Sequence, residues 1–234
     1  MLDHGISLPV DQSRIIPGYR ADDVEVTWRE PGEGIVPRGP GARDTGIARG
    51  AEAVVTLGED RVEKRRLSKA YRVPPLDRRL IAERTRAEAR LISAARRAGV
   101  PTPILQEITA DTIVMERITG PLLKEAMTPE HLQEAGRMVG RLHRAGIIHG
   151  DLTTSNMIVS GDRIALIDFG LSAVSEEVEA RGVDLHVLFQ TLRSTTAEHA
   201  LLRAAFLEGY REMLPGADEV LAREQEIEKR GRYL

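Results

Sequence analysis

One stretch decides the fold of this chain: IIHGDLTTSNMIVSGDRIALIDFG, which runs from Ile147 to Gly170. Two apolar segments within it, Met157–Val159 and Ile164–Ile167, are too short to form helices. The residues between them, Ser160-Gly161-Asp162, have the composition of a tight turn. The pattern therefore predicts a β-hairpin that holds in place the polar residues on either side of it.

Two acids and one amide flank this hairpin. His149, Asp151 and Asn156 follow the spacing H-x-D-x-x-x-x-N, and Asp168 opens an Asp-Phe-Gly triplet 17 residues after Asp151. An Asp-Phe-Gly triplet alone is often an ordinary turn, but the two motifs together form the layout of the protein kinases. Asn156 is also the only asparagine in the chain, which indicates that this position requires one.

Phosphoryl transfer explains this spacing, because it requires the protein mainly to position a metal and a nucleophile. Asp168 and Asn156 would offer a carboxylate and an amide oxygen to Mg²⁺, which takes waters and nucleotide phosphates as its other ligands. Asp151 would orient the attacking hydroxyl or water and is the candidate catalytic residue. The sequence thus predicts ATP and Mg²⁺ as cofactors.

The composition is that of a globular chain. At 234 residues it is long enough for one or two domains, and a net charge of −3 with 41% hydrophobic residues argues against a disordered chain or a strongly basic nucleic-acid binder. No apolar run approaches the roughly 20 residues that span a bilayer, and no signal-peptide pattern begins the sequence. The absence of cysteine excludes disulfides and thiolate metal sites. We therefore expect a cytoplasmic protein without a membrane partner.

The first part of the chain predicts an extension followed by a strand pair. Residues 1–45 hold five prolines and six glycines without a sustained period, so they are interpreted as an extension or linker. Ala53–Leu57 and Arg61–Arg65 then flank a Gly-Glu-Asp turn and predict a hairpin with Lys64 on its second strand. The segment around its first strand aligns with the loop that covers phosphates in kinases, which gives these candidate ATP-binding residues: Ala48, Gly50, Ala51, Glu52, Ala53 and Val55.

A long helix is predicted over Asp77–Ala98, where apolar residues recur at helical spacing and Gly99 and Pro101 follow. Glu88 falls on its apolar face and would point inward. A buried carboxylate needs a cationic partner, and kinase architecture supplies Lys64 in that role. The same helix carries seven arginines, which we interpret as a solvated outer face, with contact to a polyanion as the alternative.

A further hairpin is predicted from Ile104–Ile108 and Thr112–Glu116, after which the chain leaves the sheet in a segment that looks like a kinase hinge. Met115, Glu116 and Ile118 are the candidate adenine contacts in this segment.

Helical periodicity dominates the rest of the chain, with one helix over residues 129–145 and a closing helix over 217–229. We therefore expect an α+β, bilobal, protein-kinase-like fold with a small β-rich N-lobe and a reduced, mainly helical C-lobe. The expected boundaries are 46–118 for the N-lobe, 119–229 for the C-lobe and 230–234 for a basic tail.

With these motifs assembled, the chain resembles the atypical small kinases, and most closely the kinase/ATPase subunit of the KEOPS tRNA-modification complex, the PRPK family. The resemblance covers residues 46–234. It is carried by these segments: Gly50–Ala53 (G-A-E-A), Lys64–Arg72 (K-R-R-L-S-K-A-Y-R), Arg84–Ala89 (R-T-R-A-E-A), His149–Asn156 (H-G-D-L-T-T-S-N), Val183–Leu185 (V-D-L) and Arg230–Tyr233 (R-G-R-Y). It implies a Mg²⁺-dependent ATPase with weak serine/threonine autokinase activity that supports formation of threonylcarbamoyladenosine (t6A) on tRNA. It also implies the KEOPS catalytic subunit, the other KEOPS subunits and tRNA as partners.

The C-terminal tail carries part of this resemblance. By composition alone it reads as a solvated chain end. The family match instead implies that Arg230 and Arg232 contact tRNA phosphates and that Tyr233 stacks on an unpaired base.

Three departures from ordinary protein kinases bear on the reaction. Gly150 replaces the arginine that senses a phosphorylated activation loop, Thr153 replaces a phosphate-facing lysine, and only about a dozen residues separate Gly170 from Val183. Slow transfer, or hydrolysis with water as the acceptor, is consistent with these differences. Three alternatives stay open at this point: a RIO-like ribosome-assembly kinase, a small-molecule phosphotransferase and a pseudokinase scaffold.

Overall fold

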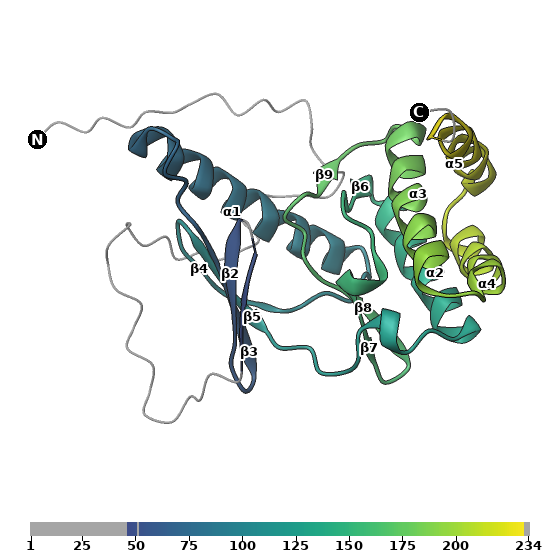
Figure 1. Ribbon diagram of the computed structural model, residues 1–234, viewed down its shortest axis with the longest axis horizontal. Coiled ribbons are helices and arrows are strands. Elements are labelled where there is room, and N and C mark those ends of the chain that lie inside the picture. The colour runs from purple at the N-terminus through teal and green to yellow at the C-terminus, as the bar shows by residue number, and fades with distance from the viewer. Residues whose placement is uncertain (1–45, 51, 232–234) are drawn as a thin grey trace, which may run out of the picture.

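The computed structural model describes residues 46–50 and 52–231, which form a smaller, strand-rich lobe and a larger, mainly helical lobe (Figure 1). This is the bilobal α+β fold predicted from the sequence. The extension predicted for residues 1–45 lies outside the described residues. The elements are, in chain order, β1 (Gly46–Arg49), β2 (Ala53–Leu57), β3 (Arg61–Arg66), α1 (Pro74–Arg97), β4 (Leu105–Ile108), β5 (Thr112–Glu116), the 3₁₀ turn η3 (Leu123–Glu125), α2 (Pro129–Arg144), β6 (Ile147–Ile148), the 3₁₀ turn η4 (Thr154–Asn156), β7 (Met157–Ser160), β8 (Arg163–Leu166), β9 (Ala173–Val174), α3 (Val178–Thr195), α4 (His199–Met213) and α5 (Ala217–Gly231).

The sheet of the smaller lobe fixes the position of Lys64. Its strand order is β1-β2-β3-β5-β4, and all neighbouring strands are antiparallel. Lys64 lies on the central strand β3, opposite Val55 of β2 and Ile113 of β5. Both predicted hairpins of this lobe are confirmed, although β4 begins at Leu105 and not at Ile104. Hydrogen-bonded ladders on both sides therefore hold the strand that carries the lysine.

Helix α1 contributes to the packing of both lobes. It begins at Pro74, three residues earlier than predicted, because prolines suit the first turn of a helix, whose N–H groups have no acceptor within the helix. Ala89 packs in a small cluster with residues of the sheet, whereas Leu91 and Ile92 lie in the main hydrophobic core with residues of the larger lobe. In Figure 1 the helix runs from above the sheet to the larger lobe. The helix that carries Glu88 is thus anchored at one end by the larger lobe.

Helices α2 and α4 pack closely in the larger lobe. A Cβ atom at Gly209 would lie 1.9 Å from the backbone oxygen of Gln133, so that only glycine permits this approach. Thr128 caps the start of α2 by accepting a hydrogen bond from the backbone N–H of His131 at 3.2 Å. The two helices predicted for this lobe over residues 129–145 and 217–229 are confirmed as α2 and α5, with ends that differ by one or two residues.

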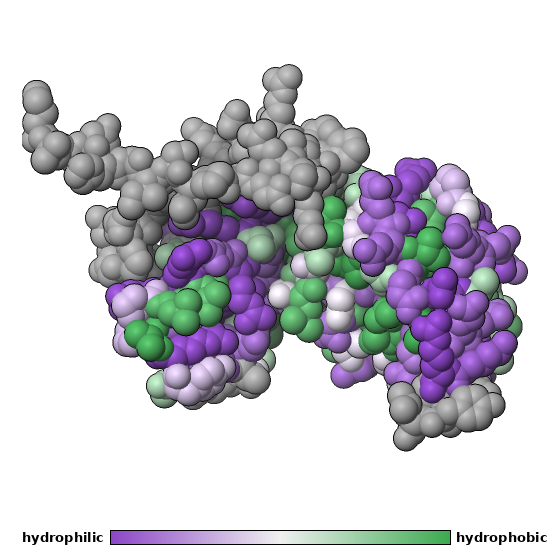
Figure 2. All heavy atoms as spheres, turned by 90° about the horizontal axis from the view of Figure 1, so that it is seen from above, coloured by the Kyte–Doolittle hydropathy of each residue, from purple (hydrophilic) through white to green (hydrophobic). Residues whose placement is uncertain are grey.

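The surface of the larger lobe is mainly hydrophilic at its outer end, as Figure 2 shows from above. Within residues 46–50 and 52–231, no helix combines the length and the apolar character that crossing a membrane requires.

The hairpin around which the sequence is organised is present as β7 and β8. Met157 pairs with Leu166 and Ser160 with Arg163, so the turn consists of Gly161 and Asp162, and Ile167 lies just outside the strand. The backbone N–H of Ile167 instead donates to the backbone oxygen of Asn156 at 2.9 Å. The residues that precede β7 and those that follow β8 are therefore neighbours at the open end of the hairpin.

Candidate active site

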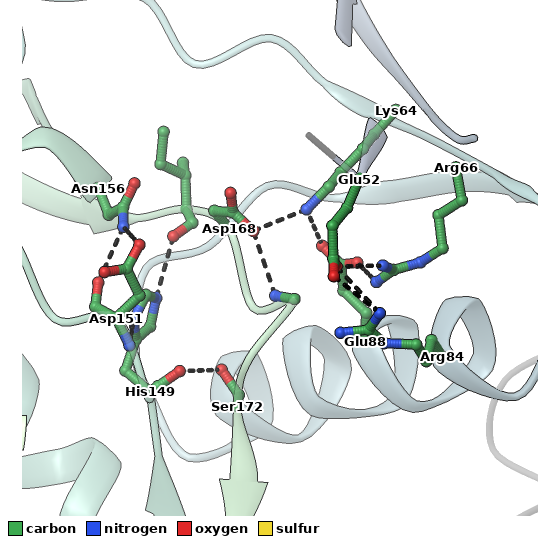
Figure 3. A network of polar contacts seen from close by, with 12 residues as sticks. Glu52, Lys64, Arg66, Arg84, Glu88, His149, Asp151, Asn156, Asp168 and Ser172 are labelled. Atoms are coloured by element: carbon green, nitrogen blue, oxygen red, sulfur yellow. Dashed lines mark hydrogen bonds and ion pairs between the residues drawn. The ribbon is translucent and has the colours of Figure 1, made fainter. Parts of the chain in front are cut away.

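Three elements converge on the ammonium group of Lys64. Its Nζ lies 2.6 Å from Oε1 of Glu88, on α1, and 2.7 Å from Oδ1 of Asp168, in the segment that follows β8 (Figure 3). The ion pair predicted between Lys64 and Glu88 is therefore present. One cation thus joins the central strand, the long helix and the Asp-Phe-Gly segment.

Glu88 has a second cationic partner that the sequence analysis did not identify. Its side chain is 1% exposed, and its other oxygen, Oε2, accepts a hydrogen bond from Nη2 of Arg66. Each oxygen of the buried carboxylate thus has its own cation, which offsets the cost of burying the charge. A signal for Arg66 was available, because residues two apart on a strand point to the same face and Arg66 follows Lys64 at that spacing.

Asp168 has an unusual backbone conformation. Its φ is +61°, and it is the only residue other than glycine with a positive φ among those that the structure describes. Such a conformation costs about 1–3 kcal/mol for a residue with a Cβ, so the surroundings must hold it. Phe169 does so from the next position, since it is buried and its ring packs edge-on against that of His149 at 5.2 Å between centroids.

The carboxylate of Asp168 stays ionised at neutral pH. Partial burial raises its pKa, but the ammonium of Lys64 and the hydrogen bonds from Lys64 and from the backbone N–H of Gly170 outweigh this, so the pKa lies below its usual value. The side chain is 51% exposed, which leaves the carboxylate accessible to a ligand.

Asn156 and Asp151 form a second polar pair beside this one. The amide nitrogen Nδ2 of Asn156 donates to the backbone oxygen of Asp151 at 2.8 Å and to its Oδ2 at 2.9 Å. Because Nδ2 of Asn156 faces Asp151, the amide oxygen of Asn156 points away from Asp151. Figure 3 shows this oxygen on the same side of the site as the oxygen of Asp168 that does not contact Lys64. The hydrogen bond between Ile167 and Asn156 keeps the two oxygen donors adjacent.

Asp184, on α3, is a positioning residue to which the sequence analysis assigned no role. Its side chain is 2% exposed and accepts hydrogen bonds from the backbone N–H groups of His149 at 2.6 Å and Gly150 at 2.8 Å. It therefore fixes the start of the loop that carries Asp151. The sequence held two signals for it: Val183–Leu185 belongs to the family resemblance, and Asp184 directly precedes Leu185, which is buried in the core.

A buried histidine also contacts the carboxylate of Asp184. Nε2 of His143 lies 3.3 Å from Oδ2 of Asp184, and Nδ1 lies 2.8 Å from the hydroxyl of Tyr210. Burial lowers the pKa of His143 and raises that of Tyr210, so both groups are neutral at pH 7. Because the carboxylate only accepts hydrogen bonds, Nε2 of the neutral ring donates to Asp184 and Nδ1 accepts from Tyr210.

Gly150 is required by two features of this loop. Its φ is +80°, and a Cβ atom there would lie 2.3 Å from the backbone oxygen of Leu171. The residue that replaces the arginine of ordinary kinases thus lets the segment after Asp168 pack directly on the loop that carries Asp151. Ser172 reinforces this contact, since its hydroxyl donates to the backbone oxygen of His149 at 2.9 Å.

The remaining candidates for binding ATP and tRNA lie on several different elements. Met115, in β5, is buried in the small cluster that also contains Ala89. The side chain of Glu116 accepts a hydrogen bond from the backbone N–H of Ile104 at 3.0 Å, and Arg230 lies on α5, away from the nucleotide candidates. The remaining candidates are distributed as follows: Ala48 in β1, Gly50 directly after it, Glu52 in the bend before β2, Ala53 and Val55 in β2, Ile118 after β5, and Ala51, Arg232 and Tyr233 outside the described residues.

Replacing Asp184 by alanine is expected to lower the free energy of unfolding by about 2–5 kcal/mol, because two buried backbone N–H groups and His143 lose their acceptor. Urea unfolding followed by circular dichroism measures this. The matched control is Asp218→Ala, since the Asp218 side chain is 84% exposed and its ion-pair partner, Arg211, is exposed as well. Equal stability of the two variants would contradict the role given to Asp184.

Comparison with known proteins agrees with this geometry. The family model described as RIO domain matches residues 59–193. A probable bifunctional tRNA threonylcarbamoyladenosine biosynthesis protein of Methanoculleus marisnigri is 66% identical over 235 residues, which cover all of this chain and 44% of that relative. The chain thus spans about half the length of the curated relatives of this kind. A probable serine/threonine-protein kinase BUD32 homolog of Archaeoglobus fulgidus is 51% identical over 185 residues, or 79% of this chain and 94% of the relative.

A solved structure shares the fold. The Rio2 kinase of Chaetomium thermophilum, in its ADP/Mg²⁺-phosphoaspartate complex, aligns with a TM-score of 0.55 at 16% identity and covers 81% of this chain and 71% of its own. The matching domain model and the nearly full-length match to the kinase homolog, together with the contacts of Lys64, Glu88 and Asp168, lead to one assignment. The chain belongs to the RIO domain family of kinase-like proteins, in the group that contains the BUD32 homologs.

Proposed function

We propose that this chain is a Mg²⁺-dependent ATPase with weak serine/threonine autokinase activity, and that it acts as a KEOPS subunit in t6A modification of tRNA. The observation that carries the proposal is the double contact of Lys64 with Glu88 and Asp168. It supports a nucleotide site, because a lysine so held has its ammonium group beside the carboxylate that would hold the metal.

The donor set at the open end of the β7–β8 hairpin fits Mg²⁺. Asp168 and Asn156 offer one carboxylate oxygen and one amide oxygen from adjacent positions. Residues 46–50 and 52–231 contain no group of three or more histidine, cysteine, aspartate or glutamate side chains suited to holding a metal. A cation bound here would take its other ligands from water and phosphates, as Mg²⁺ does, and would neutralise charge on the phosphates of a bound nucleotide.

The side chains around the proposed nucleotide site have different tasks. Lys64 binds phosphate oxygens and Glu88 keeps its ammonium group in position. Asp151, whose Oδ2 is held by Asn156, orients a hydroxyl or water for attack and accepts its proton. Asp184 keeps the backbone of that loop fixed while the reaction proceeds.

The short segment after Asp168 supports water, or a residue of the chain itself, as the acceptor. Only nine residues lie between Asp168 and the start of α3 at Val178, and two of these, Ala173 and Val174, pair with β6. Such a segment offers little backbone on which an extended peptide substrate would dock. Thr153, in place of a lysine, removes one positive charge near the transferred phosphoryl group and supports slow turnover.

The relatives support the partners in this proposal. The bifunctional relatives are named for t6A biosynthesis, and this chain matches less than half of their length. We therefore propose that the catalytic subunit of the modification, together with the other KEOPS subunits and tRNA, binds this chain, and that it acts in the cytoplasm. Ala48, Gly50, Ala51, Glu52, Ala53 and Val55 would border the phosphates, and Met115, Glu116 and Ile118 would border the adenine.

An ATP hydrolysis assay tests the proposal most directly. The full chain is incubated with Mg²⁺ and ATP, alone and with tRNA and the partner catalytic subunit. We expect slow hydrolysis that rises when both are added. Stimulation by ribosomal precursors would favour a RIO-like ribosome-assembly role, and transfer to an added aminoglycoside would favour a small-molecule phosphotransferase. Nucleotide binding without any turnover would favour a scaffold.

Deletion of residues 230–234 is expected to leave the fold intact but to weaken binding of tRNA. Arg230 is 61% exposed, and its ion pairs with Glu179 at 3.5 Å and Glu226 at 3.7 Å are surface pairs that a phosphate group would replace at low cost. The slope of log affinity against log salt should fall by roughly 0.7–0.9 for each tRNA phosphate that the shortened chain no longer binds. The control is Arg211→Gln, which changes an exposed arginine on α4. If the salt slope is unchanged after the deletion, residues 230–234 do not contact tRNA.

A further inference from the structure

An acidic residue lies in the loop that would cover the phosphates. Glu52 belongs to the bend between β1 and β2, and an ionised carboxylate facing a nucleotide there would repel its phosphates. The hydrogen bond from Arg84 and the charges of Arg84, Arg66 and Lys69 lower the pKa of Glu52, so it is ionised at neutral pH. Its negative charge must therefore be compensated within the protein.

The contacts of Glu52 show how this is achieved. Nη1 of Arg84, on α1, donates to Oε1 of Glu52 at 3.0 Å, and Nη1 of Arg66, on β3, lies 3.8 Å from Oε2. Figure 3 shows the carboxylate of Glu52 directed toward these two arginines. The backbone is also held, since the N–H of Leu67 donates to the oxygen of Glu52 at 2.9 Å. Both the side chain and the backbone of this loop residue are thus attached to neighbouring elements.

We propose that Arg84 and Arg66 hold the phosphate-covering loop in its working position through Glu52, which makes all three positioning residues for the nucleotide. The proposal rests on the proposed function in one respect, namely that this loop covers the phosphates. In this arrangement the Glu52 side chain contacts Arg84 and Arg66 and does not contact the nucleotide.

Arg66 connects this attachment to the lysine. Its Nη1 lies near Glu52 while its Nη2 bonds to Glu88, which in turn holds Lys64. A guanidinium has several donors in a fixed plane, so Nη1 and Nη2 of Arg66 each face a different carboxylate. The guanidinium of Arg66 thus helps to position both the phosphate-covering loop and Lys64.

Helix α1 supplies the rigid support for this arrangement. Arg84 and Glu88 are one helical turn apart on it, and the following turns are buried in the main core with residues of the larger lobe. The loop, the lysine and Asp168 are thereby positioned relative to one helix that both lobes hold.

The test compares the full chain with Glu52→Gln, Arg84→Gln and the double variant. Calorimetry gives the Kd of Mg²⁺-ADP, hydrolysis assays give KM and kcat for ATP, and hydrogen exchange of the nucleotide-free protein reports on the amides of Gly50, Glu52 and Ala53. Arg79→Gln is the matched control, because it removes an exposed ion pair of 2.7 Å with Glu83 on the same helix.

Each single variant should raise the Kd and the KM about two- to fivefold, the effect expected of a partly exposed ion pair, with a smaller change in kcat. The double variant should be no worse than Glu52→Gln, because that change already removes the contacts of Glu52 with both Arg84 and Arg66. Hydrogen exchange should accelerate at the loop amides in these variants and not in Arg79→Gln.

Additive effects of the two single changes, unchanged loop exchange, or an equal effect of Arg79→Gln would overturn the proposal. The hydrogen-exchange result is independent of turnover. If the wild-type chain binds Mg²⁺-ADP but hydrolyses no ATP, the proposed ATPase activity fails, while the exchange pattern still decides whether Glu52 holds the loop.

Discussion

Replacing Asp168 by asparagine or alanine is expected to abolish Mg²⁺-dependent nucleotide turnover, with a loss of roughly 10³-fold or more. Either change removes the carboxylate that lies 2.7 Å from the Lys64 ammonium and that would hold the metal. The asparagine variant is the more informative one, because asparagine tolerates the backbone φ of +61° at this position better than alanine does. Turnover is measured as phosphate release over a range of Mg²⁺ concentrations, and calorimetry gives the affinity for Mg²⁺-ADP.

A matched control for this prediction lies on the same hairpin. Asp162 is an exposed aspartate in the turn between β7 and β8, and Asp162→Ala should leave turnover unchanged. Melting curves of both variants separate a loss of chemistry from a loss of folding. An Asp168→Asn variant that folds and still hydrolyses ATP at the wild-type rate would exclude Asp168 as a metal ligand.

Replacing Asp151 by alanine is expected to slow turnover by about 10²–10⁴-fold while leaving nucleotide affinity largely intact. The reason is that Asp151 would act on the attacking hydroxyl or water, whereas Asp168 would act on the metal and the phosphates. Asn156 keeps its hydrogen bond to the backbone oxygen of residue 151 in this variant, so the amide oxygen should stay in place.

Calorimetry of the two variants distinguishes these tasks. If Asp151→Ala loses affinity for Mg²⁺-ADP as severely as Asp168→Asn, the division of labour between the two acids is wrong. If neither variant alters turnover, the reaction belongs to another part of the molecule and the proposed ATPase site fails as a whole.

The sequence by itself determined the hairpins, the long helix and the order of the motifs, because each depends on residues close together in the chain. It also predicted that Glu88 points inward and requires a cation, since the apolar face of a helix follows from its 3.6-residue period. Helix α1 begins three residues before the predicted start, because Pro74 and Pro75 form its first turn.

Only the tertiary structure decided which charged groups meet. The bond between Lys64 and Asp168 joins residues 104 positions apart, Asp184 reaches the loop of His149 across 35 positions, and Glu52 reaches Arg84 across 32. Local periodicity gives the direction of a side chain relative to its own helix or strand, but the partner depends on how separate elements pack. The pair of Lys64 and Glu88 could therefore be predicted, because it belongs to a known architecture. The contacts of Arg66, Asp184 and Glu52 depend on how α1, α3 and the sheet pack, and only the structure shows them.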